Sequence, residues 1–238
     1  MSSSRGNQRS FERWTVNQRI QHITLILSFT TLVVTGLPLR YSELRISETV
    51  VKLMGGITMR GHLHRAAALV LILLSIYHLG YIVFSQRGRR EFMAIMPKFQ
   101  DVKDSIGMLL LYLGFSNQKP RFGKYNFIEK FEYFALAWGS VIMIVTGAVL
   151  WFVNDAMKIL PKWAIDIAQI VHSYEALLAF LAILIWHFYH VHLNPEVFPM
   201  SWTWLNGKVS ENELREHRPL EYERLLAKQC GTNNEDVA

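Results

Sequence analysis

Apolar residues gather in four long runs that alternate with polar segments. The runs occupy residues 20–39, 64–84, 131–152 and 170–192. Each run is close to the roughly 20 residues that an α-helix needs to cross the hydrocarbon core of a bilayer. The pattern therefore predicts an all-α membrane protein built as a bundle of four transmembrane helices.

Two further segments complete the predicted architecture. Residues 104–115, DSIGMLLLYLGF, are too short to span a bilayer and are typical of an amphipathic helix that lies on the membrane surface. From residue 194 onward the chain is polar, and Glu and Leu at helical spacing predict a short soluble helix. We expect a transmembrane domain over residues 1–193 and a C-terminal tail over residues 194–238.

Composition supports an integral membrane protein, because 51% of the 238 residues are hydrophobic. The N-terminus lacks the apolar core and small-residue cleavage site of a signal peptide, so we expect the first run to be retained. The chain has one cysteine, Cys230, which excludes a C-x-x-C-H haem attachment site and cysteine-ligated clusters within it. Any haem would be held noncovalently.

The basic residues predict the orientation. The net charge is +6, and many of the basic residues that cause it flank the apolar runs. This position favours membrane lipid over nucleic acid as the partner. Four arginines precede the first run, and eight lysines or arginines lie within residues 85–124, after the second run. By the positive-inside rule, both termini lie in the cytoplasm and the protein is a multi-pass component of the inner membrane.

The fourth run contains several histidines. A histidine inside a membrane helix is costly without a partner, so it suggests a functional site. His172 and His187 are fifteen residues apart, which is roughly 22 Å along a helix and about 60° around it. Both rings can face the bundle interior, one near each membrane surface, whereas His190 and His192 lie further toward the interface.

Histidines of the other runs fall at the same two depths. If successive helices run in opposite directions, His64 lies with His172 at the outer level. His22 and His78 both lie with His187 at the inner level. A six-coordinate b-type haem takes two imidazole ligands, so this arrangement predicts two b-type haems. At the inner level, His22 and His78 remain alternatives as the ligand opposite His187.

Other functions and features remain open. A histidine-lined metal-ion transporter is a rival interpretation, but it needs membrane acids and Glu175 is the candidate. Pairing with haem propionates is one explanation for the basic residues of the first outer loop, namely Arg40, Arg60 and Arg65. Gly36 lies on nearly the same helix face as His22, where it favours either the approach of a flat macrocycle or close helix packing. The tripeptide VTG occurs at 34–36 and again at 145–147, through an internal repeat or by chance.

Several stretches resemble one known family. They are QRIQHITL in the first run, GHLHRAA at the start of the second, GKYNFIEK before the third, VHSY and WHFYHVH in the fourth, and NGKVS in the tail. The chain resembles the four-span, di-haem cytochromes b, such as the gamma subunit of respiratory formate dehydrogenase and the b subunit of nickel-iron hydrogenase. The resemblance covers nearly the whole chain.

The resemblance implies roles for individual residues. It implies that His64 and His172 bind the outer haem and that His22 and His187 bind the inner haem. A menaquinone or ubiquinone site would lie beside the inner haem and use the asparagine of GKYN, Asn126. His78 would then take part in proton transfer or contact quinone, or it would replace His22 as a ligand. Alternatively, Asn126 caps the third transmembrane helix, since Asx residues favour helix starts.

We therefore expect a subunit that carries electrons across the membrane through two b-type haems. The outer partner would be an iron-sulfur subunit or a multihaem cytochrome c, and the cytoplasmic partner would be quinone. The subunit would belong to an oxidoreductase complex and carry its quinone site. The alternative is a membrane anchor whose haems are structural and which has no quinone site of its own.

Overall fold

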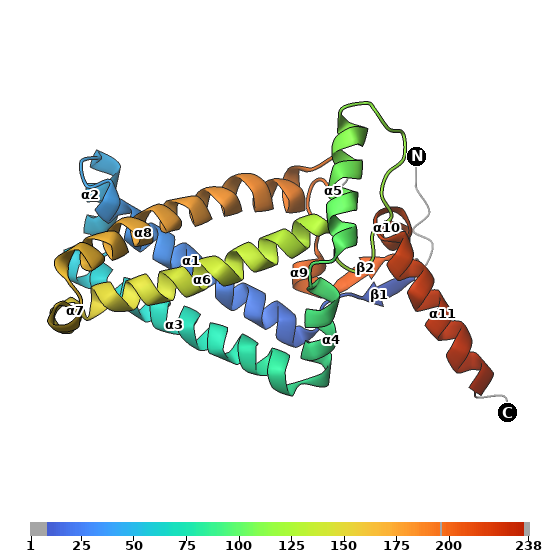
Figure 1. The fold of residues 1–238 in the computed structure, drawn as a ribbon, viewed down its shortest axis with the longest axis horizontal. Coiled ribbons are helices and arrows are strands. Elements are labelled where there is room, and N and C mark those ends of the chain that lie inside the picture. Colours follow the sequence, from blue (N-terminus) through green and yellow to red (C-terminus); the bar gives the residue numbers. More distant parts are fainter. Residues whose placement is uncertain (1–8, 196, 236–238) are drawn as a thin grey trace. The chain divides into compact units, whose positions relative to one another are not determined.

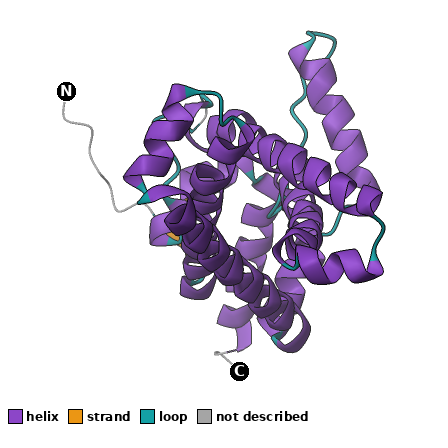
Figure 2. Cartoon of the chain, turned by 90° about the vertical axis from the view of Figure 1, so that its left-hand side faces the viewer, coloured by secondary structure: helices purple, strands orange, loops and turns teal. Residues whose placement is uncertain are grey.

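The computed structural model describes residues 9–195 and 197–235, and side chains as far as residue 229. Helices dominate it (Figures 1 and 2). In the described part, four helical segments are long and apolar enough to cross a membrane. They are α1 (Val16–Arg40), α3 (Gly56–Phe84), α6 (Phe127–Trp151) and a fourth segment over Lys162–Leu193. The predicted fold class, an all-α membrane bundle, is confirmed.

The chain forms two compact units. One, the membrane unit, consists of Asn17–Val83 and Phe134–Ser201. The other, the terminal unit, consists of Met1–Val16, Phe84–Tyr133 and Trp202–Ala238. The predicted division into residues 1–193 and 194–238 concerns where the chain leaves the membrane, and it stays a prediction.

The membrane-spanning helices begin earlier than the apolar runs. Helix α3 begins at Gly56 rather than at residue 64, and the last helix begins at Lys162 rather than at residue 170. The predicted polar loop after the first run contains α2 (Arg45–Leu53), and the predicted polar link before the fourth run contains α7 (Val153–Ile159). The first eight residues of α3 and of the last helix mix polar and apolar side chains, so hydropathy alone does not find where the helix begins.

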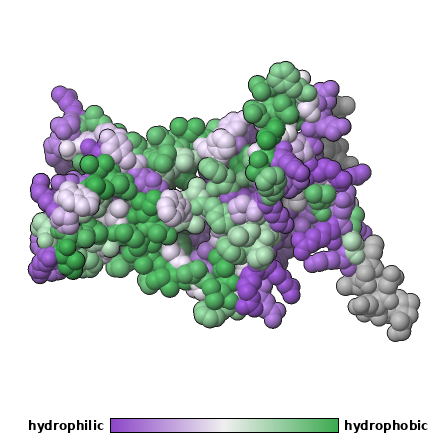
Figure 3. All heavy atoms as spheres, in the orientation of Figure 1, coloured by the Kyte–Doolittle hydropathy of each residue, from purple (hydrophilic) through white to green (hydrophobic). Residues whose placement is uncertain are grey.

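Small side chains lie at most of the buried positions described in the membrane unit. They include Ser28 and Thr35 of α1, Ala67 of α3 and Ala168 of α8. Small residues allow membrane helices to approach one another closely. Large apolar side chains such as Leu27, Leu73 and Ile185 are instead about two-thirds exposed (65%, 65% and 66%). Apolar surface covers much of these helices (Figure 3), as expected where lipid is the solvent.

The fourth spanning segment changes its helix type partway along. It begins as α8 (Lys162–Leu181) and continues as two π-helical stretches, η1 (Ala182–His187) and η2 (Tyr189–Leu193). The N–H of Phe188 donates to the carbonyl of Ile183, five residues back. A π-helix adds residues to a turn and lowers the rise, and such segments are frequent at functional sites. The residues between His172 and His187 therefore span less than the same number in an α-helix.

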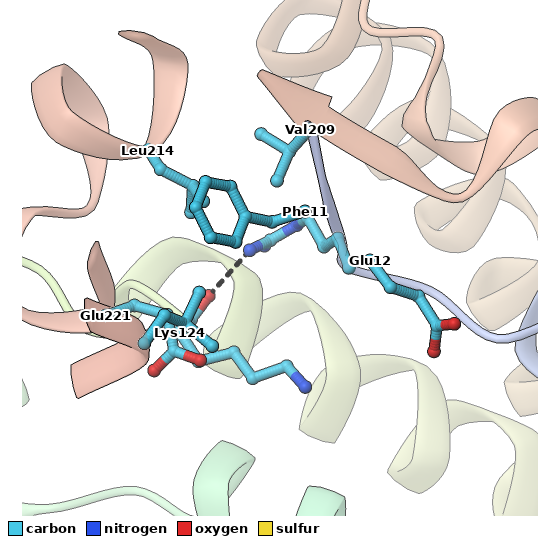
Figure 4. Close-up of a pocket in the computed structure, with 8 residues that line it drawn as sticks. Phe11, Glu12, Lys124, Val209, Leu214 and Glu221 are labelled. Atoms are coloured by element: carbon cyan, nitrogen blue, oxygen red, sulfur yellow. Dashed lines mark hydrogen bonds between the residues drawn. The ribbon is translucent and has the colours of Figure 1, made fainter. Parts of the chain in front are cut away.

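The terminal unit joins segments that are far apart in the sequence. Strand β1 (Ser10–Glu12) pairs antiparallel with β2 (Lys208–Ser210), with Phe11 opposite Val209. Its helices are α4 (Gln86–Ile95), α5 (Phe99–Tyr112), the start of α6, α9 (Thr203–Asn206), α10 (Glu211–His217) and α11 (Pro219–Glu235). Figure 4 shows Phe11, Val209 and Leu214 converging in a small cleft, which contains none of the predicted site residues.

Two helical parts of the terminal unit were expected from the sequence. Helix α5 contains most of the predicted surface segment, and it carries an exposed apolar row at helical spacing, Phe99, Val102, Ile106 and Leu109. Helices α10 and α11 supply the soluble helical structure expected in the tail. The strand pair was not expected, because two three-residue strands nearly 200 residues apart leave no local periodic pattern.

Candidate functional site

Four of the predicted site residues form two facing pairs within the membrane unit. His64 of α3 and His172 of α8 lie with their ring centroids 6.5 Å apart and their planes at 69°. His22 of α1 and His187 of η1 also lie 6.5 Å apart, with their planes at 56°. We call these the 64/172 pair and the 22/187 pair. Each pair joins two different helices, so the bundle brings its members together.

His78 is not the ring opposite His187. Its Nδ1 donates a hydrogen bond to Oε1 of Gln21 on α1, over 2.7 Å. The amide of Gln21 in turn donates to Oδ1 of Asn17, over 3.1 Å, and the hydroxyl of Tyr77 donates to the same oxygen, over 3.0 Å. His78 therefore belongs to a polar chain that links α3 to the first turns of α1.

The remaining histidines of the fourth segment contact their own helix. The Nδ1 of His190 donates to the carbonyl oxygen of Trp186 over 2.8 Å, and the two rings lie 4.7 Å apart. The ring of His192 lies 4.4 Å from that of Phe188. These local contacts set both side chains apart from the two facing pairs.

Threonine and glycine residues contact the 64/172 pair directly. The hydroxyl oxygen of Thr35 lies 2.8 Å from Nδ1 of His64, and that of Thr146 lies 2.9 Å from Nδ1 of His172. A Cβ placed on Gly36 would meet Cε1 of His64 at 3.3 Å. The VTG repeat that contains these residues is visible in the sequence, but nothing in the sequence connects it with the histidines.

Arginine side chains surround the same end of these helices. The guanidinium of Arg60 donates to the backbone carbonyl of Thr35, over 2.9 Å. Arg40 lies over the ring of Tyr174 at 4.0 Å, and Arg65 lies over the ring of Trp151 at 5.4 Å. The sequence analysis considered these three arginines as partners of haem propionates. In the structure each of them has an aromatic or backbone partner within the protein.

Asn126 lies in the terminal unit and caps helix α6. Its Oδ1 accepts a hydrogen bond from the N–H of Glu129, and its own N–H donates to Oε2 of Glu129, both over 2.9 Å. This reciprocal arrangement is a capping box, in which two unpaired N–H groups at a helix start are satisfied. The expected cap role is therefore present, and it uses the oxygen of the amide rather than its nitrogen.

Two arginines hold Glu129 in place. Arg13, near the N-terminus, donates to Oε1 of Glu129 over 2.9 Å, and Arg218, in the tail, donates to both carboxylate oxygens over 2.9 Å. Arg13 is 8% exposed, and burial is the main reason that its pKa lies below the usual value, followed by the positive charge of Arg218. This ion cluster connects the segments around Arg13 and Arg218 to the start of α6.

The sequence profile of a family described as prokaryotic cytochrome b561 matches residues 13–199, which include both histidine pairs. The chain belongs to the prokaryotic cytochrome b561 family. A comparison with curated proteins finds no match. Membership in the cytochrome b561 family makes this chain a membrane haem protein of b type, in agreement with the resemblance found in the sequence and with its four apolar helices.

Proposed function

We propose that the protein carries electrons across the membrane through two b-type haems, one held by the 64/172 pair and one by the 22/187 pair. Haem b supplies one-electron chemistry at its iron. The chain supplies two neutral imidazoles for each haem and an apolar surround. The outer-face partner would be an iron-sulfur subunit or a multihaem cytochrome c, and quinone would react at the cytoplasmic side.

The observation that carries this proposal is the separation of the paired rings. With a metal–nitrogen bond of about 2 Å and about 1 Å from the ring nitrogen to the ring centre, two imidazoles on one metal have centroids roughly 6 Å apart. Both pairs have centroids 6.5 Å apart. The donor chemistry also fits, because histidine nitrogens would bind haem iron.

The donor set favours haem over a bare metal ion. Among the described residues, no group of three or more His, Cys, Asp or Glu side chains gathers to hold an ion. A six-coordinate b-type haem would take two protein ligands, because the macrocycle provides the rest of the donor set. Pairs of histidines are therefore the arrangement that a bis-histidine haem requires, whereas a metal-ion transporter needs larger clusters along its path.

Haem counting tests the proposal. Protein purified from membranes should show a reduced spectrum of b type and contain two haems per chain, and acid-acetone should extract all of it. Substitution of any of the four paired histidines should reduce the count. A protein with one haem per chain, or with none, would contradict the proposal.

For quinone, the proposal uses Asn126 and His78. The amide nitrogen of Asn126 is a hydrogen-bond donor suited to a quinone carbonyl, and the cap uses only the amide oxygen. A hydrogen bond from this group would contribute roughly 0.5–1.5 kcal/mol to binding. His78 lies in the chain of polar groups that includes Gln21 and Asn17, which suits it to pass protons.

A matched pair of variants separates the cap from the quinone contact. Asn126→Asp keeps an oxygen that caps α6 but removes the amide N–H donors, and Asn and Asp are similarly good caps. Asn126→Leu removes both. If Asn126 contacts quinone, both variants slow quinol-dependent haem reduction while haem content stays at the wild-type level. If Asn126 is only a cap, Asn126→Asp exchanges electrons with quinone at the wild-type rate.

The cap geometry favours one alternative function. Because Asn126 already has a structural role at the start of α6, the protein would serve as a haem-containing membrane anchor if no quinone binds there. The two functions differ in one measurement, since an anchor would show no quinone-dependent oxidation of its haems.

A further inference from the structure

The same tripeptide, Val-Thr-Gly, occurs in two helices, and its threonine contacts a different histidine in each. On α1 they are residues 34–36, and on α6 they are residues 145–147, which is 111 positions later. Thr35 contacts Nδ1 of His64 at 2.8 Å, and Thr146 contacts Nδ1 of His172 at 2.9 Å. The two histidines are the members of one pair. The repeat in the sequence therefore corresponds to a repeated contact on both sides of a single site.

The hydroxyl groups determine which ring nitrogen carries the proton. The hydroxyl of Thr35 lies 2.6 Å from the carbonyl oxygen of Thr31, and that of Thr146 lies 2.7 Å from the carbonyl oxygen of Ile142. A carbonyl oxygen only accepts, so each hydroxyl gives it its single hydrogen. Toward the histidine the hydroxyl oxygen can then only accept. Each neutral ring must therefore carry its proton on Nδ1, which leaves a lone pair on Nε2.

The glycines lie close to Cε1 of each ring, the atom next to Nδ1. A Cβ on Gly36 would lie 3.3 Å from Cε1 of His64, and a Cβ on Gly147 would lie 3.1 Å from Cε1 of His172. Both distances are shorter than an ordinary carbon–carbon contact of about 3.5–4.0 Å. Each ring therefore lies against helix backbone at a position that only glycine leaves open without displacing it.

We propose that Thr35-Gly36 and Thr146-Gly147 are positioning pairs that fix the tautomer and the direction of His64 and His172. Each threonine accepts a hydrogen bond from Nδ1 and so keeps the proton on that nitrogen. Each glycine lets the ring lie close against the helix backbone, in an orientation in which Nε2 faces the opposite histidine. This inference rests on the proposed function, in which these two nitrogens bind one haem iron. It adds that the redox properties of that haem are set by residues on α1 and α6, which supply none of its ligands.

The physical effect expected is on ligand strength. A hydrogen bond from Nδ1–H to an acceptor makes the imidazole a stronger electron donor through Nε2, and loss of such a partner typically costs 10–100-fold in metal affinity. A stronger donor favours the ferric over the ferrous state. If removal of the hydroxyl weakens ferric binding tenfold more than ferrous binding, the midpoint potential rises by about 59 mV for one electron.

The experiment compares threonine variants in the full-length protein by redox titration with visible spectroscopy. Thr35→Val and Thr146→Val keep the side-chain shape and remove the hydroxyl, whereas Thr35→Ser and Thr146→Ser keep it. Thr31→Val is the matched control on α1, because the hydroxyl of Thr31 donates to the carbonyl of Leu27 on the same helix. We expect both valine variants to raise the potential of the same haem, and the serine and control variants to keep both potentials.

The glycine variants give an independent test that does not depend on the hydroxyl. Gly36→Ala and Gly147→Ala should each push a ring by a few tenths of an ångström and reduce retention of that same haem during purification. The inference is overturned if both valine variants, or both alanine variants, leave potentials and haem content at wild-type values. It is also overturned if Thr35→Val and Thr146→Val affect different haems. A wild-type protein without two haems would instead contradict the proposed function.

Discussion

Replacement of either member of the 64/172 pair by alanine should cost one haem, and the same one in both cases. His64→Ala and His172→Ala each remove one of the two imidazoles that lie 6.5 Å apart, on helices α3 and α8. The expected haem content falls from two per chain to one. His22 and His187 belong to the other pair and keep their partners, so the second haem should stay bound.

The distance between the two histidine pairs limits how far the midpoint potential of the remaining haem can shift when the other haem is lost. Nine α-helical steps lead from His172 to Leu181, followed by a π-helical stretch of smaller rise, so the pairs are roughly 20 Å apart along the last helix. At an effective dielectric constant of about 20, unit charges at that distance interact by about 0.8 kcal/mol. This corresponds to about 36 mV for a one-electron couple.

The assay is haem quantification together with redox titration of each purified variant. The two variants should give superimposable spectra of one remaining b-type haem. Its midpoint potential should lie within about 40 mV of the wild-type value, because the charge that is lost with the other haem is distant. If His64→Ala and His172→Ala leave different haems behind, the pairing is wrong. A shift of the remaining potential by well over 100 mV would refute the wide separation of the two haems.

Three further predictions follow from other parts of the molecule. His78→Leu should keep both haems, because His78 bonds to Gln21, whereas His22→Leu should lose one, because His22 faces His187. Counting the haems in each variant tests this, and the reverse result would assign the ligand to His78. Both termini should be cytoplasmic by the distribution of basic residues, so a protease added to the outer face should leave a C-terminal tag intact. Glu129→Gln should destabilise the terminal unit by about 2 kcal/mol, which is below the usual cost of breaking a buried ion pair because Glu129 is partly exposed. Thermal unfolding measures this loss of stability. As a control, Glu223→Gln should change stability by less than about 1 kcal/mol, because its partner Arg121 is exposed.

Much of the membrane architecture follows from the sequence alone. A run of about 20 apolar residues has few stable structures in a bilayer other than a helix, because its backbone must satisfy its own hydrogen bonds. Depth is also a property of each helix by itself, since an α-helix rises by a fixed amount per residue and the π-helical stretches of the fourth segment change this rise only locally. For these reasons the sequence could place His64 with His172 at one depth, and His22 and His78 with His187 at the other.

What the sequence could not choose was the partner of His187. His22 and His78 lie at similar depths, and they differ in the direction in which each ring points relative to the other helices. That direction depends on the rotation of α1 and α3 about their own axes within the bundle, which periodicity in a single helix does not determine. The structure turns His22 toward His187 and His78 toward Gln21.

Contacts between distant segments were likewise decided only by the tertiary structure. The VTG tripeptides are ordinary helix residues until α1 lies beside α3 and α6 lies beside α8, where each threonine meets a histidine. Strands β1 and β2, and the arginines that bind Glu129, are about 90 to 200 residues from their partners. The sequence alone thus determined the helices and the depths of their polar groups, because both depend on local and additive properties. The pairing of those groups depends on how the helices are rotated and packed, and that is a property of the whole fold.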